Sequence, residues 1–417
     1  MSQPATDKLP DALVRYSRMA IWAVIAVLTL SQFFYAMQLK NGLTEIIDPY
    51  SESNAVRAGE CYVENGFLSN AGLPYSSYGD RFATEGHRAI ESPTDPSFKF
   101  RHQAYTHYPQ GAEWIVGVAT LVFGKGRLSF YRLFPIVFSC LAMLFLAQAL
   151  IRRLGAPCAA MVIAACAAAP MFSKMMHHLH FLGYTLALLL AQFAVLLHLN
   201  CSNGGERRRW LIWLGILAFV QGWFSFDYCF LVVFSPFVFA LLDWPGREKA
   251  NWKQGLLAVI VAGGAFSLAH TIHFAEVVAY YGSLQTALED FGASASYRAA
   301  GTGHERNVLG SLVTLYGSAL FSPGNVYFEI SFGPMLGVAL AAWLAVCVAG
   351  KGEPHTFLVR TGPAVVAAII VSALWLVVMR GHALEHWHVL PRHWFLLYFS
   401  LILALAGEVK RLTASRA

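Results

Sequence analysis

Charged side chains are scarce in this chain. Asp, Glu, Lys and Arg make up 13% of its 417 residues, whereas 57% of the residues are hydrophobic. So little charge cannot cover the surface of a water-soluble protein, and the composition is instead typical of a polytopic membrane protein. The net charge of +6 comes mostly from Arg and Lys clusters between apolar segments, so it gives no reason to expect a nucleic-acid partner.

A disulfide framework is also lacking. Of the seven cysteines, only Cys61 falls in a predicted outer loop, and the others lie in or beside apolar segments, where thiols behave as small apolar groups. No cleavable signal peptide is apparent, because the first apolar segment has the length of a membrane span and lacks a small-residue cleavage site. We therefore interpret that segment as an anchor.

Long apolar runs are abundant. Ten windows approach the length that a helix needs to cross a bilayer, near residues 20–39, 130–150, 157–173, 181–199, 210–225, 228–243, 255–275, 330–350, 360–379 and 392–407. Two further apolar stretches, 113–123 and 309–321, are too short to cross. The sequence predicts an all-α polytopic integral membrane helix bundle of about ten transmembrane helices, within a range of ten to twelve. It forms one domain over 1–417, without a separate soluble domain.

Basic residues sort the loops into two faces. The Arg and Lys clusters share one face if ten segments cross and 113–123 does not, and the positive-inside rule makes that face cytoplasmic. Both termini are then cytoplasmic, and we expect the plasma membrane, which is the inner membrane of a bacterium. The extracytoplasmic face receives a large loop at 41–127 with interfacial helices, a second region at 276–329 and most of the fifteen His residues. Polar groups that converge on one end of a bundle indicate a functional site.

Three motifs carry a resemblance to a known family. Acidic residues follow the first span closely, at Asp48 and Glu52, and an "A…A…Y.ENG" helix comes next. The loop ends with "HYPQG" before an apolar helix, where Gln110 replaces the second proline of the family's "YPPL" or "KPPL" element. The last outer loop is rich in His and Arg and is followed by "LPRHW". The chain thus resembles the GT-C superfamily of membrane glycosyltransferases, which includes protein O-mannosyltransferases and lipid A aminoarabinose transferases.

The resemblance implies a glycosyltransferase whose donor is a sugar on a polyprenyl phosphate. The acceptor stays open among proteins, lipids and glycans. A carboxylate of the first loop would take the acceptor proton as the hydroxyl attacks, with inversion at the anomeric carbon. Asp48 is the first candidate for this base and Glu52 the second, and the family's usual Asp-Glu pair is not present as such. The alternative for Asp48 is a turn residue, since Asp before Pro commonly opens a turn.

The leaving phosphate would need cations or hydrogen-bond donors. Arg392 is the best candidate, since Arg binds phosphate bidentately and stays charged, and His386 and His388 lie in the same loop. His107 and Tyr108 of the second motif are candidates for contact with the donor phosphate or sugar. Structural alternatives stay open for Arg392 as an interfacial anchor and for Tyr108 as a member of the aromatic belt.

Three further features supply candidates. His177, His178 and His180 lie at a predicted outer turn, and three His so close could bind a metal. Because no carboxylate is near them in sequence, contact with phosphate or acceptor is favoured, and we expect no cofactor, with a divalent metal as the less favoured alternative. Asp227 lies at the end of a span, either as a functional group or as the N-cap of the next helix. Arg298 is a weaker candidate phosphate ligand.

Two other functions compete with the enzyme. A transporter or flippase would carry ionisable groups and Gly or Pro breaks at mid-membrane, whereas polarity here concentrates at one face. A non-catalytic relative would explain the absent Asp-Glu pair and the Gln110 replacement. The sequence favours the glycosyltransferase, with the lipid-linked donor and the bilayer as its partners.

Overall fold

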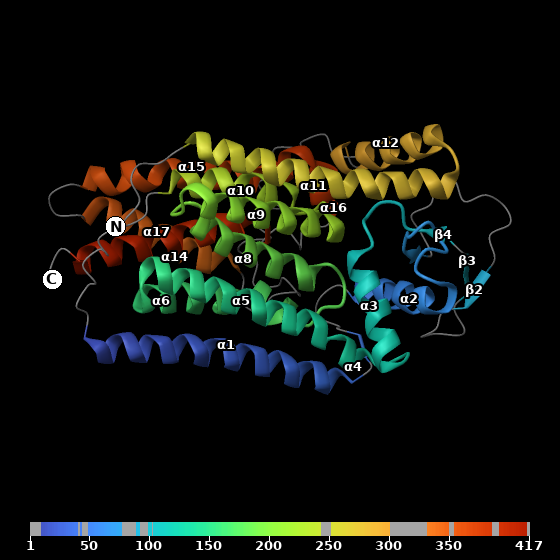
Figure 1. Ribbon diagram of the computed structural model, residues 1–417, viewed down its shortest axis with the longest axis horizontal. Coiled ribbons are helices and arrows are strands. Elements are labelled where there is room, and N and C mark those ends of the chain that lie inside the picture. Colours follow the sequence, from blue (N-terminus) through green and yellow to red (C-terminus); the bar gives the residue numbers. More distant parts are fainter. Residues whose placement is uncertain are drawn as a thin grey trace.

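Long helices run side by side along the long axis of the molecule (Figure 1). The computed structural model describes residues 10–40, 42–43, 49–76, 89–91, 99–101, 103–242, 252–300, 332–349, 354–385 and 392–414. Both termini lie at one end of the bundle, and short helices and strands gather at the other (Figure 1). The architecture is that of a helical integral membrane protein.

Each of the ten apolar windows overlaps one helix of the bundle. These helices are α1 (Asp11–Leu39), α5 (Leu133–Leu154), α6 (Ala156–Ala168), α8 (Leu182–Leu199), α9 (Gly204–Phe224), α10 (Cys229–Leu241), α11 (Trp252–Tyr281), α14 (Phe332–Ala349), α15 (Pro354–Val378) and α17 (Phe395–Ala414). Within the described ranges, five helices are long and apolar enough to cross a membrane, namely Asp11–Leu39, Leu128–Leu154, Leu182–Leu199, Trp252–Tyr281 and Thr356–Val378. The predicted polytopic helical bundle is confirmed, and the number of crossings stays a prediction.

Helix α8 lies at the centre of the bundle. Of the residues in its most apolar window, 94% are buried, whereas the share is 28% in the corresponding windows of α1 and α11. A helix with neighbours on every side must be apolar all round, and the run "LALLLAQFAVLL" meets that requirement apart from Gln192.

Gln192 offsets a gap in the neighbouring helix. Pro236 lies inside α10 and has no N–H, so the carbonyl of Val232 one turn earlier loses its helical donor. The side-chain amide of Gln192 donates to that carbonyl at 2.7 Å and to Ser235 Oγ at 3.0 Å. Because the interior of a membrane bundle offers no water, the freed carbonyl needs such a donor from the protein.

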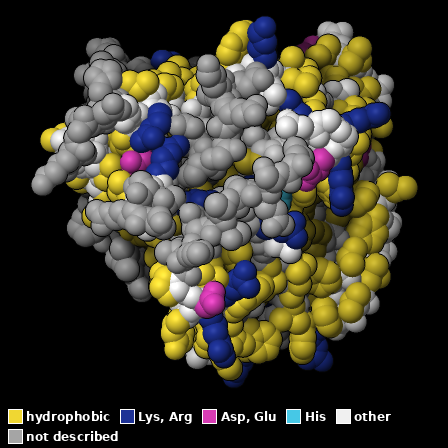
Figure 2. Space-filling model, turned by 60° about the vertical axis from the view of Figure 1, so that its left-hand side comes forward, with side chains coloured by type: hydrophobic (Ala, Val, Ile, Leu, Met, Phe, Trp, Pro, Cys, Tyr) yellow, Lys and Arg dark blue, Asp and Glu magenta, His cyan; other side chains and the backbone are white. Residues whose placement is uncertain are grey.

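Basic side chains gather at the end of the bundle that holds the termini. Figure 2 shows Lys and Arg there, beside an apolar flank. Lys410 of α17 donates to the carbonyl of Arg153 in the last turn of α5 at 3.0 Å, and Arg153 Nη2 lies 3.4 Å from Nδ1 of His198 in the last turn of α8. Three helix ends therefore meet at this basic end, in agreement with the predicted sorting of charge to one face.

The described parts of the predicted loop 41–127 form a cap on the opposite end of the bundle. The cap contains α2 (Pro49–Asn65) and α3 (Gly111–Phe123), and α4 (Leu128–Tyr131) follows it and leads into α5. Strand β1 (Tyr75–Ser76) pairs with β4 (Gln103–Ala104), and β2 (Ala89–Glu91) pairs with β3 (Lys99–Arg101), both antiparallel. Helices α2 and α3 pack so closely at Gly59 that a Cβ atom there would lie only 2.8 Å from the backbone nitrogen of Gly117.

Three further helices complete the described structure: the short helices α7 (Pro170–Met175) and α16 (Arg380–Glu385), and the longer α12 (Leu284–Ala300). Helix α12 lies along the last part of α11, which extends from the bundle toward the cap (Figure 1). The predicted short apolar stretch 309–321 and the rest of the second outer region after residue 300 lie outside the described residues.

We expect Gln192→Leu to lower the stability of the bundle, because it leaves the Val232 carbonyl buried without its donor. The loss should be about 1–2 kcal/mol, the range for an unsatisfied buried polar group in a helical bundle. The double variant Gln192→Leu with Pro236→Ala should recover part of the loss, since Ala restores the helical N–H. Thermal unfolding in detergent measures both, and a double variant no more stable than Gln192→Leu would contradict this explanation.

Candidate active site

Buried charged side chains gather where the cap meets the bundle. Helix α9 begins at the basic end, so the turn after Phe224 lies at the opposite end, beneath the cap. Residues 103–110, which we call the 103–110 loop, lead from β4 to α3 and cross this region. The last turn of α12 and residues 392–394 before α17 contribute the other charged groups.

Asp227 is the centre of the first group. Its carboxylate lies 2.7 Å from Nη2 of Arg392 and accepts a hydrogen bond from the hydroxyl of Tyr108 at 3.1 Å. The Asp227 and Arg392 side chains are only 2% and 3% exposed, so the pair is shielded from water. The N-cap position of α10 is Tyr228, not Asp227. The helix-cap alternative for Asp227 is therefore wrong, and its functional role stays a prediction.

Aromatic rings surround this pair. Tyr108 stacks on Phe226, Phe181 and Tyr105 with ring centroids 4.7, 5.6 and 5.6 Å away. The guanidinium of Arg298, at the end of α12, lies 4.6 Å from the ring centroid of Phe226 and 5.3 Å from that of Tyr108. We call Tyr108, Asp227, Arg298 and Arg392 the Asp227 cluster.

The Asp227 cluster holds two cations and one carboxylate. Cation–π contacts stabilise a desolvated guanidinium, which explains how Arg298 can be 8% exposed. Burial and the nearby Asp227 carboxylate raise the pKa of Tyr108 well above its ordinary value, so the hydroxyl stays protonated and donates to Asp227. Among these four described residues, two guanidiniums thus lie beside one carboxylate in a low-dielectric environment, and buried guanidiniums can hold an anionic ligand.

A second group, the juxtamembrane cluster, is centred on Arg132 at the start of α5. The side chains of Arg132 and Glu52 are both fully buried, and Arg132 Nη2 lies 3.0 Å from Glu52 Oε2. The same nitrogen donates to the carbonyl of Gly42 at 2.7 Å, and Glu52 Oε1 accepts from the backbone N–H of Leu179 at 3.4 Å. The ion pair therefore ties Glu52 of α2 to the start of α5.

Asp48 lies outside the described residues, as do His386 and His388. The described residues on either side of the Asp48 segment are held by one guanidinium, because Arg132 binds Gly42 before it and Glu52 after it.

The turn at 177–181 joins the two clusters. At one end, Leu179 donates to Glu52, and His177 Nδ1 lies 2.6 Å from Gln32 Oε1. Burial, His178 and Arg132 lower the pKa of His177 to about 3, so its ring is neutral. At the other end, the ring of His180 lies 4.1 Å from that of Phe181, which packs on Tyr108.

His178 and His180 lie close together at this turn. The Nδ1 of His178 accepts from the backbone N–H of His180 at 3.3 Å, and the two ring centroids are 6.3 Å apart. In the described part of the chain, no three His, Cys, Asp or Glu side chains are arranged to hold a metal ion. One of the two ring nitrogens of His178 is thus used within the turn.

His107 turns toward α12 rather than taking part in the Asp227 contacts described above. Its Nε2 lies 3.5 Å from Asp290 Oδ1, and its ring lies 5.7 Å from that of Tyr105. The predicted contact between His107 and the donor stays a prediction.

An apolar groove borders the Asp227 cluster. It has a volume of about 610 Å³ and lies between α10, α11 and α12. Five phenylalanines line it, Phe230, Phe234, Phe266, Phe274 and Phe291, together with the polar side chains of Ser267, His270 and Thr271. The ring of His270 lies 6.4 Å from Phe226, which is the ring beneath Arg298. A groove with aromatic walls and a cation near one edge suits an amphiphilic ligand.

Glu113 is a buried carboxyl that the sequence analysis missed. It lies in the first turn of α3 and is 8% exposed. Burial raises the pKa of its carboxyl to about 7. The hydrogen bond from its own backbone N–H lowers the pKa but does not offset the effect of burial. Acidic residues are common in the first turn of a helix, so nothing in the sequence distinguishes this one from an exposed residue.

Of the predicted site residues, the structure brings Tyr108, Asp227, Arg298 and Arg392 into one cluster and places Glu52 in the other. Sequence reasoning missed Arg132, although a lone Arg at the start of an apolar segment is itself a signal of a buried partner. It also missed Asp290, which occupies the same face of α12 as Arg298.

No family model and no curated protein matches the sequence. Among solved structures, the chain is similar to ArnT from Cupriavidus metallidurans bound to undecaprenyl phosphate, with 15% identity and a TM-score of 0.43 over 94% of this chain and 77% of that one. It is also similar to the oligosaccharyltransferase AglB from Archaeoglobus fulgidus in complex with an inhibitory peptide and a dolichol-phosphate, with 12% identity and a TM-score of 0.46 over 92% of this chain. A second AglB structure, in complex with Zn and sulfate, gives 12% identity and a TM-score of 0.46.

This chain spans 77% of the ArnT chain and half of the AglB chain. Both proteins are members of the GT-C superfamily, which the loop motifs of this chain resemble. At these identities and TM-scores the likenesses carry no argument about the site, so its interpretation depends on the contacts among its own residues.

We expect Arg132→Gln to destabilise the protein by about 3–5 kcal/mol, because it leaves Glu52 buried as an unpaired charge. The double variant Arg132→Gln with Glu52→Gln should lose less than Arg132→Gln alone, since it removes that charge. Thermal unfolding of the purified protein compares the two. A double variant less stable than Arg132→Gln would show that the unpaired charge of Glu52 is not the cause of the lost stability.

The pKa of Glu113 predicts a pH dependence of stability. A carboxyl whose pKa is raised from 4.5 to about 7 holds its proton more tightly in the folded state, so its contribution is greatest at low pH and is lost as the pH rises toward 7. Glu113→Gln should therefore be more stable than the wild type above pH 7, by roughly 2–3 kcal/mol, and similar to it near pH 4.5. Unfolding curves across this pH range test this, and a difference that does not change with pH would contradict it.

Proposed function

We propose that this chain is an integral-membrane glycosyltransferase that takes a sugar from a polyprenyl-phosphate donor at the Asp227 cluster. The observation that carries the proposal is a pair of buried guanidiniums, Arg298 and Arg392, in a cluster connected through Phe226 to His270 in the wall of an apolar groove. A polyprenyl phosphate combines an apolar chain with an anionic head, and the groove and the cluster match these two parts.

The phosphate is assigned to the Asp227 cluster because of its charge. Arg392 is fixed by Asp227, whereas the hydrogen bond of Arg298 goes to the neutral hydroxyl of Ser294 on its own helix. Arg298 can therefore offer N–H groups to an anion without breaking an ion pair. A guanidinium binds phosphate oxygens in a bidentate fashion, and its effect is larger where water is excluded.

The prenyl chain is assigned to the groove between α10, α11 and α12. Its volume of about 610 Å³ is within the usual range of small-molecule sites, and phenylalanines form much of its wall. Phe226 and His270 connect the groove to the guanidinium of Arg298. An apolar chain in the groove would bring its phosphate to the cluster.

The reaction follows from these assignments. The acceptor oxygen forms a bond to the anomeric carbon, the bond from that carbon to the phosphate oxygen breaks, and its electron pair leaves with the polyprenyl phosphate. The acceptor proton passes to a carboxylate of the first loop. Asp48 is the preferred base, since it follows the first span closely in sequence, and Glu52 is second because Arg132 already holds it.

The proposal places the site on the extracytoplasmic face, with both termini in the cytoplasm and the chain in the plasma membrane of a bacterium. The gathering of Lys and Arg at the end that holds the termini supports this orientation. The charged groups of both clusters lie at the opposite end of the bundle, which favours an enzyme over a transporter, whose ionisable groups would lie at mid-membrane. The proposal includes no metal, and activity after purification in a chelator tests that point.

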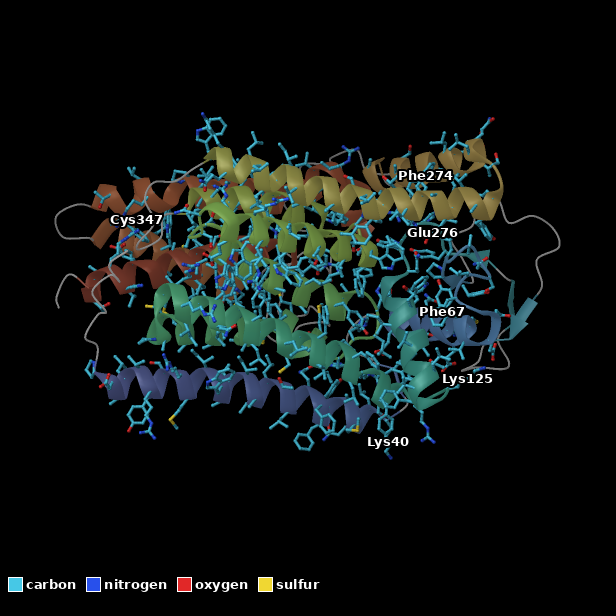
Figure 3. All side chains as sticks on the ribbon, viewed as in Figure 1. Lys40, Phe67, Lys125, Phe274, Glu276 and Cys347 are labelled. Carbon is cyan, nitrogen blue, oxygen red and sulfur yellow. The ribbon has the colours of Figure 1, made fainter. Side chains whose placement is uncertain are left out.

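We expect Arg298→Gln to weaken the binding of undecaprenyl phosphate to the protein in nanodiscs by about tenfold to a hundredfold, the range for loss of a charge-assisted hydrogen bond. Lys125→Gln is the matched control, because Lys125 is an exposed cation at the same end of the molecule, paired with Glu64 (Figure 3). The control should bind like the wild type. Equal binding by Arg298→Gln and the wild type would remove the phosphate assignment.

Release of the labelled sugar from a polyprenyl-phosphate donor tests the reaction itself. The wild type should release sugar in the presence of a membrane extract that supplies acceptors, and Asp48→Asn should not. If Asp48→Asn is fully active and Glu52→Gln is also active, the first-loop carboxylate is not the base.

A further inference from the structure

Helix α12 turns a polar stripe toward the protein. Its buried residues are Ala287, Asp290, Ser294 and Arg298, which recur every three or four positions and so share one face. Leu284 and Leu288, on other faces of the helix, are more than half exposed. Burying an acidic and a basic side chain on one face is unfavourable unless each finds partners, so the contacts of this stripe determine how α12 sits.

Asp290 has its partners in the 103–110 loop. Its Oδ2 accepts a hydrogen bond from Thr106 Oγ1 at 2.6 Å, and its Oδ1 lies 3.5 Å from His107 Nε2. The side chain is fully buried. Burial by itself raises the pKa of Asp290, but the nearby ring of His107 and the hydrogen bond from Thr106 outweigh it and hold the pKa below its ordinary value. Asp290 is therefore ionised and bound to the loop.

The loop is in turn fixed to α11. The carbonyl of Thr106 accepts from His273 Nε2 at 3.0 Å, and because a carbonyl can only accept, this nitrogen must carry the proton. Glu276, one turn further along α11, accepts from the side-chain amide of Gln110 at 2.8 and 2.9 Å (Figure 3). Two contacts thus hold the loop to α11, and Asp290 ties α12 to the same loop.

Asp290 and Arg298 contact neighbouring residues of the same loop. Asp290 binds Thr106, and eight positions later on α12 the guanidinium of Arg298 lies over the ring of Tyr108, two residues after Thr106. About two helical turns, or roughly 12 Å, separate the two α12 positions along the helix axis. The two contacts together fix both the rotation and the axial position of α12 against the loop.

We propose that Asp290 is a positioning residue that sets the register of α12 and thereby holds the guanidinium of Arg298 over Tyr108 and Phe226. Without the Asp290 contact, the helix loses its hydrogen bond to Thr106 and Arg298 moves away from the rings of Tyr108 and Phe226. The register stands on the geometry alone, whereas its consequence for a phosphate ligand rests on the proposed function.

Hydrogen exchange tests the register without reference to activity. Asp290→Ala in the full-length protein should increase amide exchange within residues 284–300 by at least tenfold, while exchange in α8 stays unchanged. Glu289→Gln is the matched control, since Glu289 is the exposed neighbour on the same helix and its bond is to Gln285, also on α12. Unchanged exchange in α12 of Asp290→Ala would overturn the proposal.

Binding of undecaprenyl phosphate in nanodiscs tests the consequence. Asp290→Ala should weaken binding threefold to tenfold, and Asp290→Asn less, because Asn keeps an acceptor for Thr106. The double variant Asp290→Ala with Arg298→Gln should bind no more weakly than Arg298→Gln alone, because Asp290 acts through Arg298. Additive losses would show that Asp290 acts elsewhere. If the wild type binds no undecaprenyl phosphate, the proposed function fails, and the exchange experiment still decides the register.

Discussion

A carboxylate among aromatic rings stays ionised only if a cation lies beside it, and Asp227 has Arg392 at 2.7 Å. This ion pair joins the turn between α9 and α10 to the start of α17, two segments that are far apart in sequence. Tyr108 then binds the carboxylate from the 103–110 loop, and Arg298 lies on the aromatic rings that surround it. Four separate segments thus meet because one buried charge requires partners.

The same requirement explains how polarity is distributed in the bundle. In the interior, the neutral side-chain amide of Gln192 donates to the Val232 carbonyl that Pro236 leaves without a helical donor, so no charge is placed in the membrane. Ionised groups lie at the ends. Arg132 and Glu52 are buried as a pair just above the first span, and Lys410 and Arg153 meet at the basic end. In these examples, the charged side chains therefore lie where an oppositely charged group, a backbone carbonyl or water can contact them.

The two buried clusters are parts of one region. In the turn at 177–181, the backbone N–H of Leu179 donates to Glu52, and the ring of Phe181 stacks on Tyr108. The Arg132–Glu52 pair and the Asp227 cluster are therefore linked through directly connected contacts.

The sequence by itself determined the helical membrane fold, since long apolar windows mark the helices and basic clusters mark one end of the bundle. It also indicated Tyr108, Asp227, Arg298 and Arg392 one by one, Tyr108 through the loop motif, Asp227 as an ionisable group at the end of a span, and the two arginines through their chemistry toward phosphate. Only the tertiary structure decided that these four meet, since Asp227 lies 119 positions from Tyr108 and 165 from Arg392. It also decided that Asp290 is buried and that Gln110, which departs from the family's loop motif, binds Glu276. The physical reason is that burial and pairing depend on neighbours brought by folding, and local sequence records only which side chains are available.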